Sequence, residues 1–373
     1  MEKNEFLDKI AAGKMTRREF KKALAAAGLA MFSMPLVQRS AMADAEDHPT
    51  IFMFAGYDDE NFHQPYLEKY GESPNFSFWG DEEEAFAKIR TGFHPDIAMP
   101  CSYKVQQWKD AGMIVPIDVG RLSNWGDTIS SLKSVPGTVI DGEHYWVCMD
   151  WGQTSILYRT DLVDIEEESW GLLWDERYRG RMAMIDSLID GVMVAAIYAG
   201  AANPYDMTPD EVKRTKVLLQ EQLPLLRFYS NDMTSIQQAL ASGELVAAVV
   251  WNDSYTFLKG EGHPVAFMSP KEGAMTWTCG IGLTPWAQDL DRSYDFIDAM
   301  ISPSAGVWEI MDWGLGHANK KAFSMVDATD LKDRGLPTDP AYLDDFLASG
   351  SFQEAIQNEP ELQIMFEEVK AGF

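Results

Sequence analysis

The chain has 373 residues and carries 58 Asp and Glu against 31 Lys and Arg, a formal net charge of −27. This length predicts about two domains, and 46% hydrophobic with 24% charged residues is typical of a folded protein rather than a disordered one. A chain this acidic repels phosphate backbones and anionic membranes, so we expect no nucleic-acid partner and no affinity for a membrane surface. Cations are the partners that the charge favours.

The three cysteines, Cys101, Cys148 and Cys279, are an odd number and lie far apart in the chain. No C-x-x-C pair and no Cys/His cluster with the spacing of a zinc site occurs. The sequence therefore predicts neither a disulfide framework nor a metal site. We expect packing to be the main source of stability.

Residues 1–43 have the composition of an export signal. They contain eight Lys and Arg against four Asp and Glu, an uncharged run at 23–38, and the small residues Ala41-Met42-Ala43. The segment Thr16-Arg17-Arg18-Glu19-Phe20-Lys21-Lys22 resembles the twin-arginine export motif S/T-R-R-x-F-x-K. Cleavage after Ala43 leaves 330 residues, and the net charge goes from −27 to −31 because a net four positive charges are removed.

We therefore expect residues 1–43 to be a cleaved twin-arginine signal peptide, with the twin-arginine export machinery as a partner and the periplasm as the destination. Two other interpretations stay open. One is a basic amphipathic helix followed by a buried helix. The other is a retained membrane anchor, although the apolar run is shorter than the roughly 20 residues that span a bilayer.

From Thr50 onward, short apolar runs alternate with amphipathic segments of about ten residues, which predicts βαβ units. A first block of strands (s) and helices (h) is expected at 51–54 (s), 60–70 (h), 76–79 (s), 82–91 (h), 96–99 (s) and 102–112 (h). A second block is expected at 181–185 (s), 192–199 (h), 208–223 (h), 234–241 (h) and 245–251 (s). Thr208, followed by proline and two acids, predicts a well-capped helix start. The fold class is α/β, with two lobes joined by short crossovers where a cleft could lie.

Catalytic motifs are missing from the sequence. There is no G-x-S-x-G elbow, no H-E-x-x-H, no P-loop and no dinucleotide fingerprint. His317 is interpreted as a polar loop residue, and Asp81-Glu82-Glu83-Glu84 as a helix start placed in solvent. We expect no enzymatic activity, no catalytic residues and no cofactor.

Tryptophans next to polar turn residues are more informative. The chain has 12 Trp, and three of them occur in Asp150-Trp151-Gly152, Trp251-Asn252-Asp253 and Trp277-Thr278-Cys279. Aromatic faces attract an organic cation and carboxylates bind its nitrogen, so the combination suits an amine ligand. Filling the core is the alternative role for any single Trp.

Several segments, in order, resemble the polyamine-binding (spermidine/putrescine) group of solute-binding subunits of ABC importers: 96–103, 111–114, 169–174, 178–180, 242–244, 251–252, 270–273 and 277. The resemblance extends from about Ile51 to Gly372. It implies a two-lobed periplasmic-binding-protein fold (type II), each lobe a mainly parallel sheet flanked by helices, with the ligand cleft at the hinge and closure on binding. Lobe 1 would comprise 47–150 and 278–324, and lobe 2 would comprise 151–277 and 325–373.

The same resemblance implies a set of ligand contacts: Tyr57, Asp58, Asp59, Cys101, Tyr103, Asp186, Ser187, Asp190, Trp251, Asp253, Trp277 and Cys279. Several positions depart from the family pattern. Gly56 replaces a Trp, Cys101 replaces a hydroxyl residue and Leu315 replaces a Tyr. Ser187 replaces the first of two acids and Cys279 replaces another acid, whereas Asp190 keeps the second of the two.

The implied function is capture of a polyamine and its delivery to the membrane subunits of an ABC permease, by a monomer without metal. An extended polyamine needs a carboxylate for each desolvated ammonium group. Asp58, Asp59, Asp186 or Asp253 could replace the missing acids. A monoamine, a quaternary ammonium ion or an amino-acid-like solute stays open as the ligand, as do an exported enzyme and a sensor or adhesive module. Cys101 and Cys279 are expected to be neighbours, either bonded or simply narrowing the site.

Overall fold

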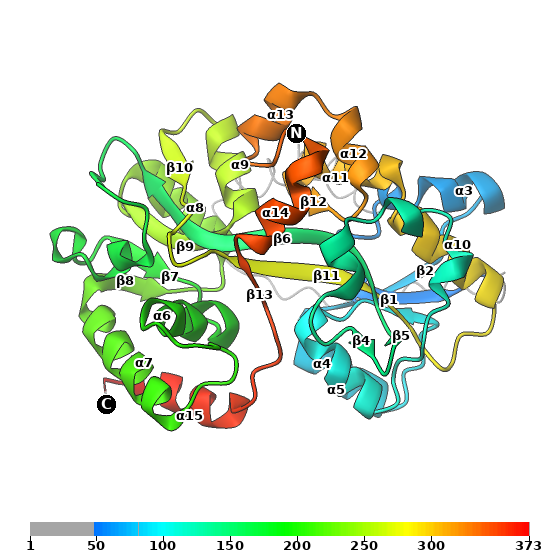
Figure 1. Cartoon of the computed structure of the whole chain (residues 1–373), viewed down its shortest axis with the longest axis horizontal. Coiled ribbons are helices and arrows are strands. Elements are labelled where there is room, and N and C mark those ends of the chain that lie inside the picture. The colour runs from blue at the N-terminus through cyan, green and yellow to red at the C-terminus, as the bar shows by residue number, and fades with distance from the viewer. Residues whose placement is uncertain (1–47, 81, 373) are drawn as a thin grey trace, which may run out of the picture. The chain divides into compact units, whose positions relative to one another are not determined.

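The computed structural model describes residues 48–80 and 82–372, so the predicted signal peptide at 1–43 lies outside the described residues. The described residues all belong to one compact unit. Within it, Figure 1 shows two groups of strands and helices, with the long strands β6 (Val147–Arg159) and β11 (Met275–Leu283) running from one group to the other. These two antiparallel strands pair from Met275 opposite Thr154 to Ile281 opposite Val147.

On one side of this pair lie three parallel strands, β1 (Thr50–Phe54), β2 (Asn75–Trp79) and β3 (Ile97–Ala98). On the other side, β9 (Ala247–Trp251) runs antiparallel to β6 and parallel to β7 (Met182–Met184), which pairs in parallel with β8 (Leu226–Tyr229). The resulting sheet has the order β2-β1-β3-β11-β6-β9-β7-β8. Three short strands pair at its margins, namely β10 (Val265–Phe267), β12 (Gly316–His317) and β13 (Ser351–Phe352), and β4 (Val139–Ile140) forms a separate hairpin with β5 (Glu143–His144).

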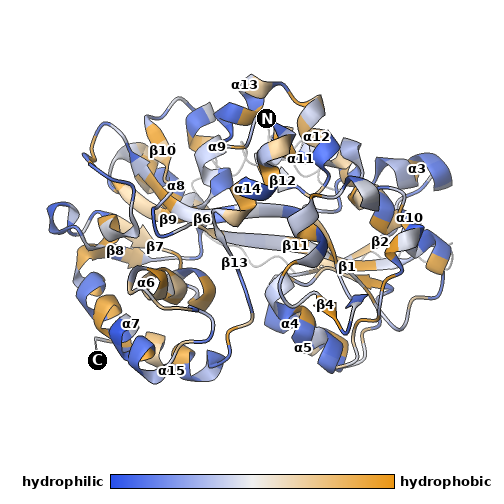
Figure 2. Ribbon diagram, viewed as in Figure 1, coloured by the Kyte–Doolittle hydropathy of each residue, from blue (hydrophilic) through white to orange (hydrophobic). Residues whose placement is uncertain are grey.

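Helices cover both groups of strands. With β1–β3 lie α3 (Gln64–Tyr70), α4 (Glu82–Arg90), α5 (Val105–Asp110) and α10 (Leu290–Met300). The helices α11 (Pro303–Trp313), α12 (Lys320–Met325), α13 (Ala328–Asp333) and α14 (Leu343–Ala348) follow in the chain. With β7–β9 lie α6 (Met193–Tyr198), α7 (Pro209–Gln222), α8 (Met233–Ser242), α9 (Asn252–Gly260) and α15 (Glu359–Lys370). Figure 2 shows polar and apolar residues alternating along α7 and α15, as expected of helices with one buried face.

The buried apolar residues form separate cores. The first core contains Ile51, Trp108 and Phe296, and the second contains Trp170, Val249 and Phe366. A smaller third cluster lies under α8 and α9. Two large cores joined through two strands agree with the expected two-lobed α/β fold. The exact lobe boundaries stay a prediction, and Leu331 and Leu347, which the sequence analysis assigned to lobe 2, pack in the first core.

Most predicted elements occur within a few residues of their expected positions. Thr208 forms a capping box with Glu211 at the start of α7, and the left-handed Gly71 ends α3. One expected helix is shorter, because the chain forms a 3-10 turn at Ser102–Lys104 before α5 begins at Val105. The long strands β6 and β11, and the helices after residue 251, were not predicted.

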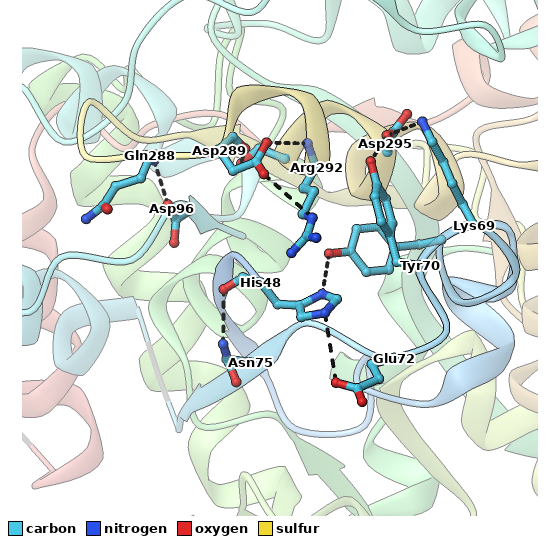
Figure 3. Close-up of polar contacts among 12 residues, drawn as sticks. His48, Lys69, Tyr70, Glu72, Asn75, Asp96, Gln288, Asp289, Arg292 and Asp295 are labelled. Carbon is cyan, nitrogen blue, oxygen red and sulfur yellow. Dashed lines mark hydrogen bonds and ion pairs between the residues drawn. The ribbon is translucent and has the colours of Figure 1, made fainter. Parts of the chain in front are cut away.

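Polar contacts join the start of the described chain to β2 and α3, and join α3 to α10, as Figure 3 shows. His48 contacts the hydroxyl of Tyr66, 2.9 Å away, and accepts a hydrogen bond from the amide of Asn75 through its carbonyl oxygen. On α10, Asp295 accepts hydrogen bonds from both Lys69 and Tyr70. The two contacts of Asp295 join segments that are more than 200 positions apart in the sequence.

Candidate functional site

The candidate site lies where β6 and β11 pass between the two cores. The register places Asp150, Gly152 and Thr154 of β6 opposite Cys279, Trp277 and Met275 of β11. Alternate residues of a strand share one face, and directly paired residues of neighbouring strands share it too. All six side-chain positions therefore belong to one face of the sheet. Acidic groups gather at its two ends, and Trp277 occupies its centre.

The first of these, the Asp190 group, consists of Asp190, Thr154, Ser187, Gln353 and Trp251. Asp190 lies in a π-helical turn after β7, with 4% of its surface exposed. Its carboxylate accepts hydrogen bonds from Thr154 Oγ1 (2.8 Å), Ser187 Oγ (3.0 Å) and Gln353 Nε2 (3.3 Å). Burial raises the pKa of Asp190, and hydrogen bonds, including one from the Trp251 side chain, partly oppose that rise.

The ring of Trp277 packs against the backbone of β6. A Cβ atom on Gly152 would come within 2.0 Å of the Trp277 ring atom Cζ2, so only glycine permits this contact. The Trp277 indole nitrogen is buried and has no hydrogen-bond partner among the described residues. Trp251, at the end of β9, keeps 36% of its surface exposed. Both tryptophans thus have aromatic surface next to the sheet face that carries the acids.

The second group, the Asp150 group, consists of Asp150, Glu309 and Tyr57. The Tyr57 hydroxyl donates to Asp150 Oδ2 over 2.6 Å, and Asp150 and Glu309 are both fully buried. Burial raises the pKa of Asp150 to about 6. Burial, followed by the charge of Asp150, raises the pKa of Glu309 well above its usual value. Near neutral pH the two carboxyl groups therefore keep one proton between them.

The thiols lie beside this second group. Cys101 and Cys279 form an isolated antiparallel bridge with their sulfur atoms 3.9 Å apart, and all three cysteines are free. The expectation that Cys101 and Cys279 are neighbours is confirmed, and no disulfide joins them. The hydrogen bond with Cys279 and burial raise the pKa of Cys101, so its thiol is neutral. In the part of the chain that the structure describes, no group of three or more His, Cys, Asp or Glu is arranged to hold a metal ion.

Glu82 and Tyr103 complete the surroundings of the thiols. The carboxylate of Glu82 accepts a hydrogen bond from the Cys101 amide over 2.7 Å, and burial raises the Glu82 pKa to about 7. Burial raises the pKa of Tyr103 as well, and the charges of Glu82 and Asp190 both add to that rise. Tyr103 therefore lies within electrostatic reach of Glu82 and of the Asp190 group. The expectation that this acidic helix start lies in solvent is wrong for Glu82, which packs under Cys101 with 8% of its surface exposed.

Four predicted acids have contacts away from these groups. Asp58 accepts from the amide of Gly56, and Asp59 caps the turn Glu60–Phe62. Asp186 forms an ion pair with Lys370 over 2.7 Å. Asp253 lies in the first turn of α9 and accepts a hydrogen bond from Ser254. Their role as ligand contacts, like that of the other predicted residues, stays a prediction.

The predicted ligand contacts did not include Asp150, Glu309, Glu82, Thr154 or Gln353, although Asp150 adjoins one of the tryptophans singled out from the sequence. Asp150 interrupts an apolar strand, and Glu309 shares a helix face with the buried residues Ala305 and Ile310. A charged residue in either setting is a signal for a buried functional group. Gln353 carries no such signal. The interpretation of His317 as a polar loop residue is wrong, because it is fully buried in β12, where its ring contacts the Met300 carbonyl.

Residues 76–337 match the family of bacterial extracellular solute-binding proteins. The chain belongs to this family. It is 23% identical over 304 residues to the spermidine/putrescine-binding periplasmic protein of Escherichia coli (strain K12), covering 80% of this chain and 85% of that protein. It is 24% identical over 234 residues to the putrescine/agmatine-binding protein of Pseudomonas aeruginosa, covering 58% of this chain and 63% of that protein.

Solved structures share the fold. The spermidine/putrescine ABC transporter substrate-binding protein PotD of Streptococcus pneumoniae aligns with a TM-score of 0.76 at 17% identity, covering 87% of this chain and 99% of that one. The binding protein MotA of A. tumefaciens, in complex with glucopine, aligns with a TM-score of 0.68 at 17% identity over 87% of this chain and 99% of that one. The predicted family, fold class and solute-binding role outside the cytoplasm are confirmed. Among residues 48–80 and 82–372, no helix is both long and apolar enough to span a bilayer.

Proposed function

We propose that this solute-binding protein captures a polyamine of the spermidine or putrescine kind between its two lobes and delivers it to the membrane subunits of an ABC permease. The observation that carries the proposal is the buried carboxylate of Asp190 beside the indole of Trp251. A carboxylate neutralises an ammonium group, and an aromatic face attracts the adjoining positive charge. The relatives named for binding spermidine, putrescine and agmatine support the same ligand class.

The charge balance of the site also favours a cation. The groups that hydrogen-bond to Asp190 are all neutral: Thr154, Ser187, Gln353 and Trp251. The nearby cation Lys370 is paired with Asp186 and Glu367. A buried carboxylate without a cationic partner costs several kcal/mol, and a bound ammonium group offsets that cost.

We also propose that the protein is exported through the twin-arginine route, is cleaved after Ala43, and acts as a monomer in the periplasm. The export part rests on the sequence of residues 1–43 alone. The periplasmic part is supported by relatives that are named periplasmic proteins. Binding without turnover is supported by the match to the family of bacterial extracellular solute-binding proteins.

A singly charged or amino-acid-like solute is the second candidate. Cys279 and Leu315 stand where the polyamine-binding pattern has an acid and a tyrosine. One solved protein of the same fold holds glucopine, which is not a polyamine. A solute with one ammonium group would need only the Asp190 group.

A thermal-shift screen of the mature protein with spermidine, putrescine, choline, amino acids and sulfonates tests the proposal. Ligand at 100 times its Kd raises the free energy of unfolding by about 2.7 kcal/mol, so binding amines will raise the melting temperature measurably. Calorimetry should then give one amine per chain. A shift with choline or an amino acid but with no polyamine would select the second candidate. A shift with anions alone would exclude both.

A further inference from the structure

An ion pair joins the two groups of strands and helices at a distance from the strands β6 and β11. Lys104 Nζ lies 3.0 Å from Glu83 Oε1 and 3.3 Å from both carboxylate oxygens of Glu359. Lys104 ends the turn before α5, and α5 packs in the first core through Trp108. Glu359 begins α15, which packs in the second core through Phe366. The ion pair therefore connects one core with the other.

Both partners come from segments that border the candidate site. Lys104 directly follows Tyr103, and its Nζ lies 5.8 Å from the centre of the Tyr103 ring. Glu359 lies six residues after Gln353, which donates to Asp190. Figure 1 shows α4, α5 and α15 on the same side of the β6–β11 pair, with α11, α12 and α13 on the other side. The two groups are thus joined twice, through the strands and through this ion pair, and the Asp190 group lies near both connections.

The cation of this ion pair is much less accessible than its partners. The side chain of Lys104 is 9% exposed, against 69% for Glu83 and 48% for Glu359. A lysine with so little exposure is normally paired with an acid, and Glu359 provides one such acid from the other core. Moving the two cores apart would break this contact and return both groups to water. A half-exposed ion pair changes an equilibrium by a factor of about five at most.

We propose that Lys104 and Glu359 form a latch, which stabilises the closed arrangement of the two lobes and slows the release of a bound amine. This inference rests on the proposed capture of an amine between the lobes. The latch forms only when the lobes meet, so it acts on a complex that already exists and must break before the ligand leaves. Its effect therefore falls on the off-rate rather than the on-rate. Lys104 is a positioning residue, because its ammonium group holds Glu359 and not the amine.

The sign of the charge on Lys104 separates a latch from simple electrostatics. Lys104 is a cation close to a site for a cation, so if it acted only through its charge, its removal would strengthen amine binding. A latch predicts the reverse. Lys104→Met and Glu359→Gln should both weaken binding, although one removes a positive charge and the other a negative one.

Stopped-flow kinetics and calorimetry of the mature protein with spermidine test the latch. We expect each variant to raise the spermidine off-rate about threefold to fivefold. The double variant should release spermidine no faster than the faster single variant, because both remove the same contact. High salt should reduce the difference between wild type and variants, since salt screens a half-exposed pair. Glu361→Gln removes an exposed acid from the same helix turn, so it controls for net charge and should leave the off-rate unchanged.

The outcomes separate the two proposals. If no amine binds the wild-type protein, the proposed function fails. If spermidine binds, and Lys104→Met leaves the off-rate unchanged or tightens binding, the latch is wrong and the proposed function stands. The melting temperature without amine reports whether each variant folds. If Lys104→Met does not fold, the comparison of Glu359→Gln with Glu361→Gln decides.

Discussion

The ring of Trp277 lies directly on the backbone of Gly152, in the middle of the paired strands β6 and β11. This contact puts a tryptophan ring between two buried acidic groups. It holds because glycine has no Cβ, and it makes the position of the ring sensitive to a single methyl group.

Gly152→Ala should therefore displace Trp277. The added Cβ would lie 2.0 Å from Cζ2 of the ring, so the ring or the strand must move. We expect the free energy of unfolding to fall by about 1–3 kcal/mol, as in other overpacked cores, and amine affinity to fall about tenfold as a cation–π contact is lost. Denaturant unfolding and calorimetry measure both. Gly126→Ala, where the added Cβ meets nothing within 4 Å, is the control and should change neither.

Asp190→Asn should abolish ligand binding while leaving the stability of the ligand-free fold nearly unchanged. Asn keeps an oxygen for the hydrogen bonds from Thr154 and Gln353, and its amide can donate to Ser187. We expect the ligand-free unfolding free energy to change by less than about 1 kcal/mol, while the melting shift caused by spermidine disappears. Because burial raises the pKa of Asp190 above its usual 3.8, ionisation costs stability as pH rises above that value, and the variant should lose less stability over this rise. An unchanged melting shift would remove Asp190 from the site.

Glu82→Gln should stabilise the ligand-free protein in mildly alkaline solution. The pKa of Glu82 is raised from 4.5 to about 7, so the neutral form is favoured in the folded state. Its contribution to stability is full below pH 4.5 and is lost as pH rises to about 7. At pH 8 the variant should be more stable by up to about 3 kcal/mol, measured by denaturant unfolding at several pH values. The neighbouring Glu83→Gln is the control, because that side chain is 69% exposed and pairs with Lys104. Equal pH profiles for wild type and Glu82→Gln would contradict the prediction.

His317 should make the protein sensitive to acid. Burial lowers its pKa from 6.5 to about 4, so the neutral ring is favoured in the folded state. That stability is present above pH 6.5 and is lost as pH falls to about 4, with a maximum near 3 kcal/mol. His317→Gln should flatten this part of the pH profile, whatever its effect at neutral pH. His263→Gln, on a half-buried residue near Glu261, should leave the slope as in the wild type.

The cysteines should titrate as three free thiols once the chain is unfolded without reductant. The sulfur atoms of Cys101 and Cys279 are 3.9 Å apart and unbonded. In the native protein we expect slow reaction, because burial raises the pKa of Cys148 and the thiolate is the reactive form. Labelling with a chromogenic disulfide reagent, with and without denaturant, measures both states. A count of one thiol in the unfolded chain would show that a disulfide had formed.

Local patterns were enough to predict much of the fold. The capping box of Thr208 and Glu211 involves residues three apart, and the strand predicted at 51–54 is a continuous apolar run. Such elements depend on neighbours within a few positions, so the sequence displays them directly. The strand β6 escaped prediction because Asp150, Gly152 and Thr154 interrupt its apolar pattern. Those interruptions are the positions that face the candidate site.

The sequence by itself determined that this is an acidic α/β solute-binding protein with an export-like N-terminus, because composition, periodicity and family segments all lie along the chain. Only the tertiary structure decided which acids share a buried space. Asp150 meets Glu309 from α11, and Gln353 reaches Asp190 from 163 positions away. The charge of a buried carboxyl group depends on its distance from water and from other charges, and those distances are set by packing between elements far apart in the sequence.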